Sequence, residues 1–99
     1  MRKRIEQEIE DEFVLECRKR RVKAIKFIDP SETGAPDRII LCPDATTFFI
    51  EFKKPKESPD QKQINYHNDL RKLGFHVYVC DNVQSALEAL LTHLEPQSI

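Results

Sequence analysis

The segment that most constrains the fold of this chain is an apolar run from Thr46 to Phe52 that contains a single carboxylate, Glu51. Such a run is typical of a buried β-strand. Side chains alternate along a strand, so Glu51 and Lys53 share one face with Phe49. A buried carboxylate costs several kcal/mol unless it is paired or bound to a metal ion. Glu51 therefore either pairs with Lys53 or Lys26, or ligates a cation.

A second carboxylate, Asp37, stands at the start of the preceding apolar segment, Arg38 to Cys42. Only Pro43-Asp44-Ala45 separates this segment from the run at 46–52, a spacing short enough for an antiparallel hairpin. Pairing of the two strands brings the carboxylate of Asp37 close to that of Glu51. Two clustered carboxylates repel each other, and a hard divalent cation removes the repulsion.

The rest of the chain reads as alternating helices and strands. Apolar residues every four positions predict a helix over residues 3–20, and the apolar runs 22–28 and 75–80 predict strands. A final helix shows one apolar face from Val83 to Leu94, with Asp81 or Asn82 as its cap. The predicted order is α-β-β-β-α-β-α, an α/β fold with a mixed sheet between helices, in a single domain over residues 1–99.

The helix after residue 57 carries two glutamines that we expect to have different roles. Ser58 is the predicted N-cap, with Pro59 at the first helical position and Gln61 completing a capping box. Gly74 is expected to end the helix. Gln63 lies on the face that turns towards the sheet, so its amide is the one expected near the carboxylates of Asp37 and Glu51.

Composition narrows the setting of the protein. The 99 residues have a net charge of −1, but acidic residues gather between positions 6 and 16 and basic ones between 18 and 26. The basic block either meets phosphates or is a solvated helix end. Three unpaired cysteines indicate free thiols in a reducing compartment, and no apolar run is long enough to span a bilayer. We expect a cytoplasmic protein that does not contact membranes.

These motifs resemble a known nuclease family. Pro36-Asp37 followed by Glu51-x-Lys53 resembles the PD-(D/E)xK signature, and three longer stretches extend the likeness. The stretches "GAPDRIIL", "FFIEFKKP" and the helix ending in "LRKLGF" are similar to those of the VRR-NUC family, the virus-type replication and repair nucleases. The resemblance covers nearly the whole chain and implies a restriction-endonuclease-like core.

The resemblance also implies a metal-dependent site. Asp37 and Glu51 match the metal-binding carboxylates, with the backbone carbonyl of Phe52 as a further ligand for Mg²⁺ or Mn²⁺. Lys53 matches the lysine that positions the attacking water and supports charge on the phosphate.

The catalytic set that the resemblance implies contains two further residues outside this core. Glu6 matches the glutamate of the first helix, although Glu8, Glu10 and Glu12 compete on spacing alone. Gln63 matches the downstream glutamine. His67 is expected to pack or to lie at the surface.

Three basic residues are candidates for contacting DNA, namely Lys26, Arg38 and Lys54. Arg38 either touches phosphate or closes a salt bridge, and a strand lysine such as Lys26 more often pairs with an acid.

The implied activity is that of a Mg²⁺- or Mn²⁺-dependent DNA endonuclease, with branched or four-way DNA (the Holliday junction) as its substrate and DNA repair as its setting. The alternative is a non-catalytic DNA-binding accessory domain that keeps the fold. A homodimer is expected because two sites suit two cleavable strands, with the first or the last helix as its interface. Replication or repair proteins are further candidate partners, and the resemblance implies a bacterial or phage-infected cell as the setting.

Overall fold

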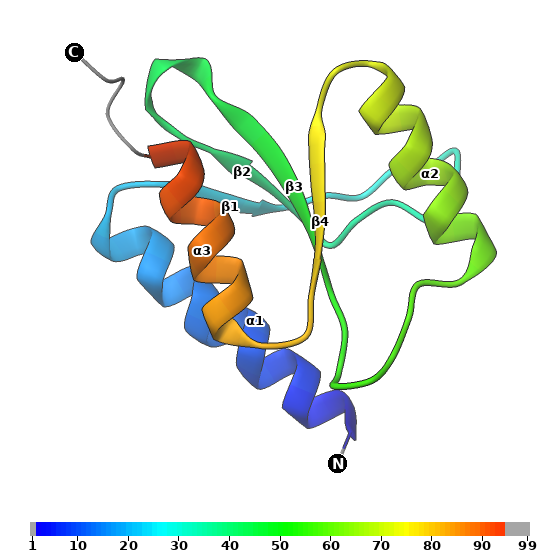
Figure 1. Cartoon of the computed structure of the whole chain (residues 1–99), viewed down its shortest axis with the longest axis horizontal. Coiled ribbons are helices and arrows are strands. Elements are labelled where there is room, and N and C mark those ends of the chain that lie inside the picture. The colour runs from blue at the N-terminus through cyan, green and yellow to red at the C-terminus, as the bar shows by residue number, and fades with distance from the viewer. Residues whose placement is uncertain (1, 95–99) are drawn as a thin grey trace.

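The computed structural model describes residues 2–94, and the side chains of residues 5–94. The elements in chain order are α1 (Arg2–Lys19), β1 (Lys23–Lys26), β2 (Arg38–Leu41), the 3-10 turn η1 (Pro43–Ala45), β3 (Thr47–Phe52), α2 (Gln61–Lys72), β4 (His76–Cys80) and α3 (Val83–Leu94). The predicted order α-β-β-β-α-β-α is confirmed (Figure 1).

The four strands form one mixed sheet in the order β1-β2-β3-β4. Strands β1, β2 and β3 are antiparallel neighbours, and the hairpin predicted around residues 43–45 is confirmed. Strand β4 pairs in parallel with β3, because the chain crosses over through α2 before it returns to the sheet. The register places Arg38 opposite Ile50, so the residue before β2 lies beside the end of β3.

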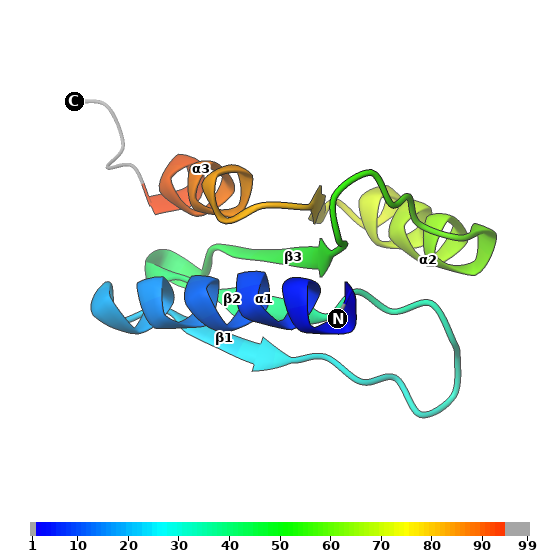
Figure 2. The same cartoon turned by 90° about the horizontal axis from the view of Figure 1, so that it is seen from below.

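The sheet separates two apolar cores. Helices α1 and α3 lie side by side, and α1 runs along the sheet (Figures 1 and 2). Their core includes Phe13 and Leu90 together with Phe48, Ile50 and Phe52 of β3. A smaller core on the other face joins Phe49 to residues that include Leu70 of α2. The alternation expected for β3 is therefore confirmed. None of the helices between residues 2 and 94 is both long and apolar enough to cross a membrane.

Helix α2 begins two residues later than its sequence predicted. Its N-cap is Asp60, whose Oδ1 accepts a hydrogen bond from the backbone N–H of Gln63 at 2.9 Å. Gln63 completes the capping box by accepting from the backbone N–H of Asp60 at 3.0 Å. The prediction of Ser58 as cap and Gln61 as its partner was wrong. Both pairs satisfy the local capping rule equally, and a tertiary contact of Gln63 decides between them.

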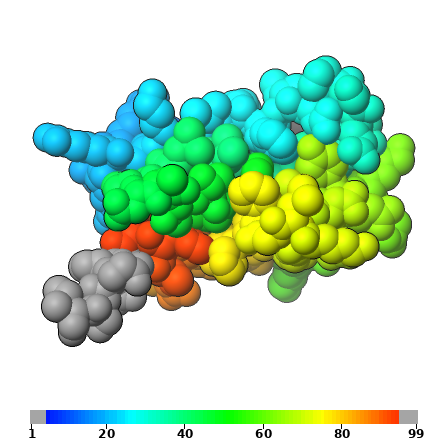
Figure 3. Space-filling model, turned by 90° about the horizontal axis from the view of Figure 1, so that it is seen from above, coloured from blue at the N-terminus to red at the C-terminus, as the bar shows by residue number. Residues whose placement is uncertain are grey.

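The segment between β1 and β2 packs against α2. Tyr66 donates its hydroxyl to Asp29 at 2.8 Å, and its ring contacts Phe27. Figure 3 shows this segment, in cyan, against the yellow-green atoms of α2. A Cβ at Gly34 would lie 2.4 Å from the backbone oxygen of Lys62 in the first turn of α2. Only glycine permits this approach, which fixes where α2 begins relative to the sheet.

Two glycines with the same positive φ allow a matched test of this contact. Gly34 and Gly74 both have φ +99°, but a Cβ at Gly74 meets nothing within 4 Å. Gly74→Ala should lower the free energy of unfolding by about 1 kcal/mol, the cost of a left-handed alanine. Gly34→Ala carries the same strain plus the clash, so we expect at least about twice that loss in chemical denaturation. Equal losses would show that the contact with Lys62 is not a constraint.

Candidate active site

The hairpin register brings Asp37 to the end of β3. Its Oδ2 accepts a hydrogen bond of 2.7 Å from the backbone N–H of Phe52, and its own carbonyl accepts from the N–H of Phe27. Asp37 is thus held by β3 and by the residue that follows β1, with its carboxylate in the field of Glu51.

Burial sets the electrostatics of Asp37. Loss of solvation raises the pKa of its carboxyl to about 6, although the Phe52 N–H opposes the rise. The negative charges of Glu51, Glu10 and Glu6 raise this pKa further. The carboxylates therefore crowd negative charge into a poorly solvated volume, and this favours the binding of a cation.

Glu51 is buried, with only 2% of the residue exposed, and three side chains surround its carboxylate. Gln63 donates its Nε2 hydrogen to Oε2 at 3.1 Å, and the Nζ of Lys53 lies 3.7 Å from the same oxygen. The Nε2 atom of His67 lies 3.4 Å from Oε1. Pairing with Lys53, one of the two readings left open by the sequence, therefore occurs beside Asp37. Lys26 is exposed on β1, at the edge of the sheet.

The amide of Gln63 joins the helix cap to the site. Because its Oε1 accepts from Asp60 at the cap, its Nε2 is the atom aimed at Glu51. The structure thus gives Gln63 the capping role that the sequence analysis assigned to Gln61. The amide of Gln61 instead donates to Asn65 on the exposed side of α2.

The glutamates of α1 separate into different roles. Glu6 is half-buried, and loss of solvation is the main cause that raises its pKa. Lys53 lowers this pKa and Glu51 raises it, so the Glu6 carboxylate lies in the field of the site. Glu10 is buried and paired with Arg38, whereas Glu8 and Glu12 are exposed.

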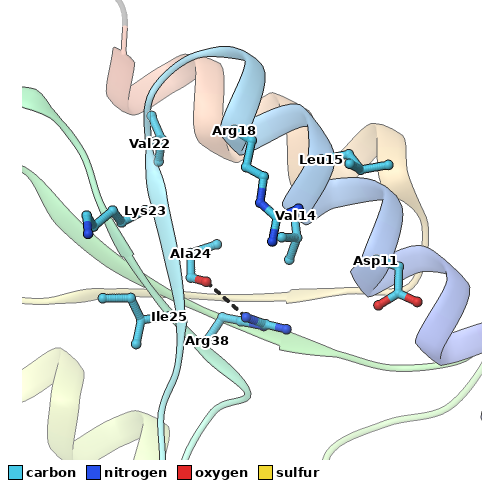
Figure 4. A pocket seen from close by; sticks show the side chains of 9 residues that line it. All are labelled: Asp11, Val14, Leu15, Arg18, Val22, Lys23, Ala24, Ile25 and Arg38. Atoms are coloured by element: carbon cyan, nitrogen blue, oxygen red, sulfur yellow. Dashed lines mark hydrogen bonds between the residues drawn. The ribbon is translucent and has the colours of Figure 1, made fainter.

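Two of the candidate DNA-binding residues have partners within the protein. The Nε of Arg38 donates to Glu10 at 2.6 Å. Its Nη1 donates to the carbonyl of Ala24 at 2.9 Å (Figure 4). Arg38 thus closes a salt bridge that joins α1 to the sheet. Lys54 pairs with Glu57 at 2.6 Å in a partly exposed turn next to the site.

His67 is the site residue that sequence reasoning did not select. It is buried, with 2% of its surface exposed, and it contacts Glu51. The available signal was its position four residues after Gln63, since residues at this spacing share a helix face. Histidine also occurs as a packed core residue, so the sequence supported that interpretation equally.

The residues at the site fit a hard divalent cation. No group of three or more His, Cys, Asp or Glu side chains that could hold a metal ion occurs in the described part of the chain. The groups that would hold such an ion, as the resemblance implies, are the carboxylates of Asp37 and Glu51 and the backbone carbonyl of Phe52. These are oxygen donors, and Mg²⁺ commonly binds to one or two carboxylates while water completes its shell.

Comparison with known proteins places this arrangement in a family. A solved structure described as a VRR_NUC domain matches 90% of this chain and 96% of its own, with a TM-score of 0.79 and 23% sequence identity. The fold is thus that of a VRR-NUC domain. A curated relative, "Putative nuclease p44" of Acyrthosiphon pisum secondary endosymbiont phage 1, is 39% identical over 77 residues, which cover 78% of this chain and 83% of the relative. No family model matches the sequence. The chain belongs to the VRR-NUC family, as its motifs suggested.

The double contact of Gln63 predicts a double phenotype. Gln63→Ala removes the cap acceptor and the donor to Glu51, so it should lower the melting temperature as well as DNA cleavage, the activity that the motifs imply. We expect a cap loss on the order of 1 kcal/mol and cleavage reduced at least about tenfold. Thermal unfolding and single-turnover cleavage measure the two effects. Gln61→Ala, the matched control on the exposed side, should change neither appreciably. A loss of activity confined to Gln61→Ala would contradict the observed helix register.

Proposed function

We propose that this protein is a metal-dependent DNA endonuclease that hydrolyses phosphodiester bonds. Membership of the VRR-NUC family and the VRR-NUC fold support a nuclease. The observation that carries the proposal is the grouping of Asp37, Glu51 and Lys53 at one end of β3. A domain that only binds DNA gains nothing from two poorly solvated carboxylates near a polyanion, so this grouping favours the enzyme over a non-catalytic accessory domain.

Each residue of the group has a defined part in the proposed mechanism. Asp37, Glu51 and the carbonyl of Phe52 would hold Mg²⁺ or Mn²⁺. When bound, such an ion lowers the pKa of a water molecule and neutralises charge on the phosphate. The side chain of Lys53 is 13% exposed, so its ammonium can reach a phosphate oxygen while Glu51 restrains it. Gln63 orients Glu51, and Glu6 faces the same site from α1.

Metal removal and three substitutions test the enzyme assignment. Mg²⁺ or Mn²⁺ should support cleavage of linear, flapped, nicked or four-way DNA, and EDTA should stop it. Asp37→Ala and Glu51→Ala should abolish cleavage and weaken Mn²⁺ binding in calorimetry, because each removes a ligand. Lys53→Met should keep Mn²⁺ binding but lower single-turnover cleavage by at least about a hundredfold. A group that acts on a proton or on charge in the transition state typically contributes this much.

Exposed residues provide the controls for these variants. Lys72→Met and Asp69→Asn change the same residue types on the surface of α2 and should leave cleavage unchanged. Full activity in EDTA, or in either carboxylate variant, would overturn the metal assignment. Near-normal turnover by Lys53→Met would remove this lysine from the mechanism.

We further propose that the enzyme acts as a homodimer on branched DNA, with α1 rather than α3 at the interface. Helices α1 and α3 both bury apolar residues in the larger core, and each leaves a leucine about half exposed, Leu15 at 53% and Leu91 at 49%. Leu15 of α1 also lines a groove of about 560 Å³ between α1 and β1 (Figure 4). Apolar residues of both elements line this groove, and a two-fold pairing would bury the patch on each copy.

A charge placed in the groove tests the dimer. Leu15→Glu should shift the sedimentation coefficient from dimer to monomer at micromolar concentration and lower cleavage of four-way DNA, with little change in melting temperature because Leu15 is exposed. Leu73→Glu is the matched control, since Leu73 is 74% exposed at the end of α2. A wild-type protein that sediments as a monomer with undiminished activity would refute the proposal.

A further inference from the structure

Two buried polar atoms lack a hydrogen-bond partner in the described part of the chain, and they face each other. They are Oε1 of Glu51 and Nε2 of His67, separated by 3.4 Å. The side chains are 3% and 2% exposed, so solvent does not compensate either atom. Buried polar groups are costly unless they are satisfied, and this pairing therefore requires a physical account.

A proton on Nε2 of His67 would explain the contact with Oε1 of Glu51. A carboxylate oxygen and the lone pair of an imidazole nitrogen repel each other at this distance. The Nε2–H tautomer instead places a donor opposite the acceptor, and a small closure of 3.4 Å completes the hydrogen bond. No net charge on the ring is needed.

The two oxygens of Glu51 lie in different surroundings. Oε2 faces Gln63 and Lys53, both partly exposed, whereas Oε1 faces His67 in the interior. Gln63 and His67 are one turn apart on α2 and reach the carboxylate from the same helix face. Helix α2 thereby restrains both oxygens, and the partly exposed partners lie on the Oε2 side.

We propose that His67 is a positioning residue: its Nε2–H holds Oε1 of Glu51, so that Oε2 is directed towards the cation shared with Asp37. The inference rests on the proposed function, because it assigns Glu51 as a metal ligand. Partners that orient a metal ligand typically change metal affinity by 10- to 100-fold when they are removed. Packing alone would give His67 no such influence.

Two substitutions separate positioning from packing. Gln at position 67 offers an amide donor near the place of Nε2, whereas Met fills similar volume without a donor. In calorimetry on the full chain, His67→Met should weaken Mn²⁺ binding at least about tenfold, and His67→Gln should stay within about threefold of the wild type. Tyr66→Phe, which removes a hydrogen bond to Asp29 on the same helix, should leave Mn²⁺ affinity unchanged.

Melting temperature reports the same hydrogen bond in the absence of metal. His67→Met leaves Oε1 of Glu51 buried without a donor, so it should melt below His67→Gln, which keeps one. Wild-type Mn²⁺ affinity in His67→Met would overturn the positioning role.

A nitrogen NMR spectrum of the metal-free protein supplies a readout independent of catalysis. The ring of His67 should show a protonated Nε2, and an unprotonated Nε2 would refute the proposal.

If wild-type protein binds Mn²⁺ and the variants rank as expected but no DNA is cut, the nuclease proposal fails while the role of His67 stands. If cleavage is normal and Mn²⁺ affinity is indifferent to residue 67, the positioning role fails alone.

Discussion

The structure depends most on the hydrogen bond between the backbone N–H of Phe52 and the carboxylate of Asp37. This bond, 2.7 Å long, exists only in the hairpin register that places Arg38 opposite Ile50. A slip of one residue would turn every side chain of the strand to the other face and move Glu51 away from Asp37. The apolar residues that fill the larger core thus fix the register, and the register fixes the distance between the two carboxylates.

Helix α2 supplies the contacts that hold the buried carboxylate of Glu51 in place. Its cap residue, Asp60, orients the amide of Gln63, and this amide bonds to Glu51. The close approach of Gly34 to the first turn fixes the place of the helix. The same contacts therefore cap the helix and orient Glu51. A substitution that loosens the start of α2 consequently affects both stability and the orientation of Glu51.

The salt bridge between Arg38 and Glu10 shows that the basic side chains close to Asp37 have different partners. Arg38 neighbours Asp37 in sequence, yet its guanidinium points to α1 and to the carbonyl of Ala24. It joins helix to sheet and leaves Lys53 as the cation that contacts Glu51. Lys53 is thus the basic side chain to which our proposed mechanism assigns the phosphate.

The sequence by itself determined the order of elements, the two faces of β3 and the proximity of the carboxylates of Asp37 and Glu51 at one end of the sheet. Each follows from side-chain periodicity or short connections, which are local properties. The tertiary structure alone decided that Asp60 rather than Ser58 caps α2, that Arg38 pairs with Glu10, and that His67 faces Glu51. In these cases local rules allowed more than one outcome. Contacts between residues 12 to 28 positions apart in the chain selected one of them, because buried charges and polar atoms must find partners.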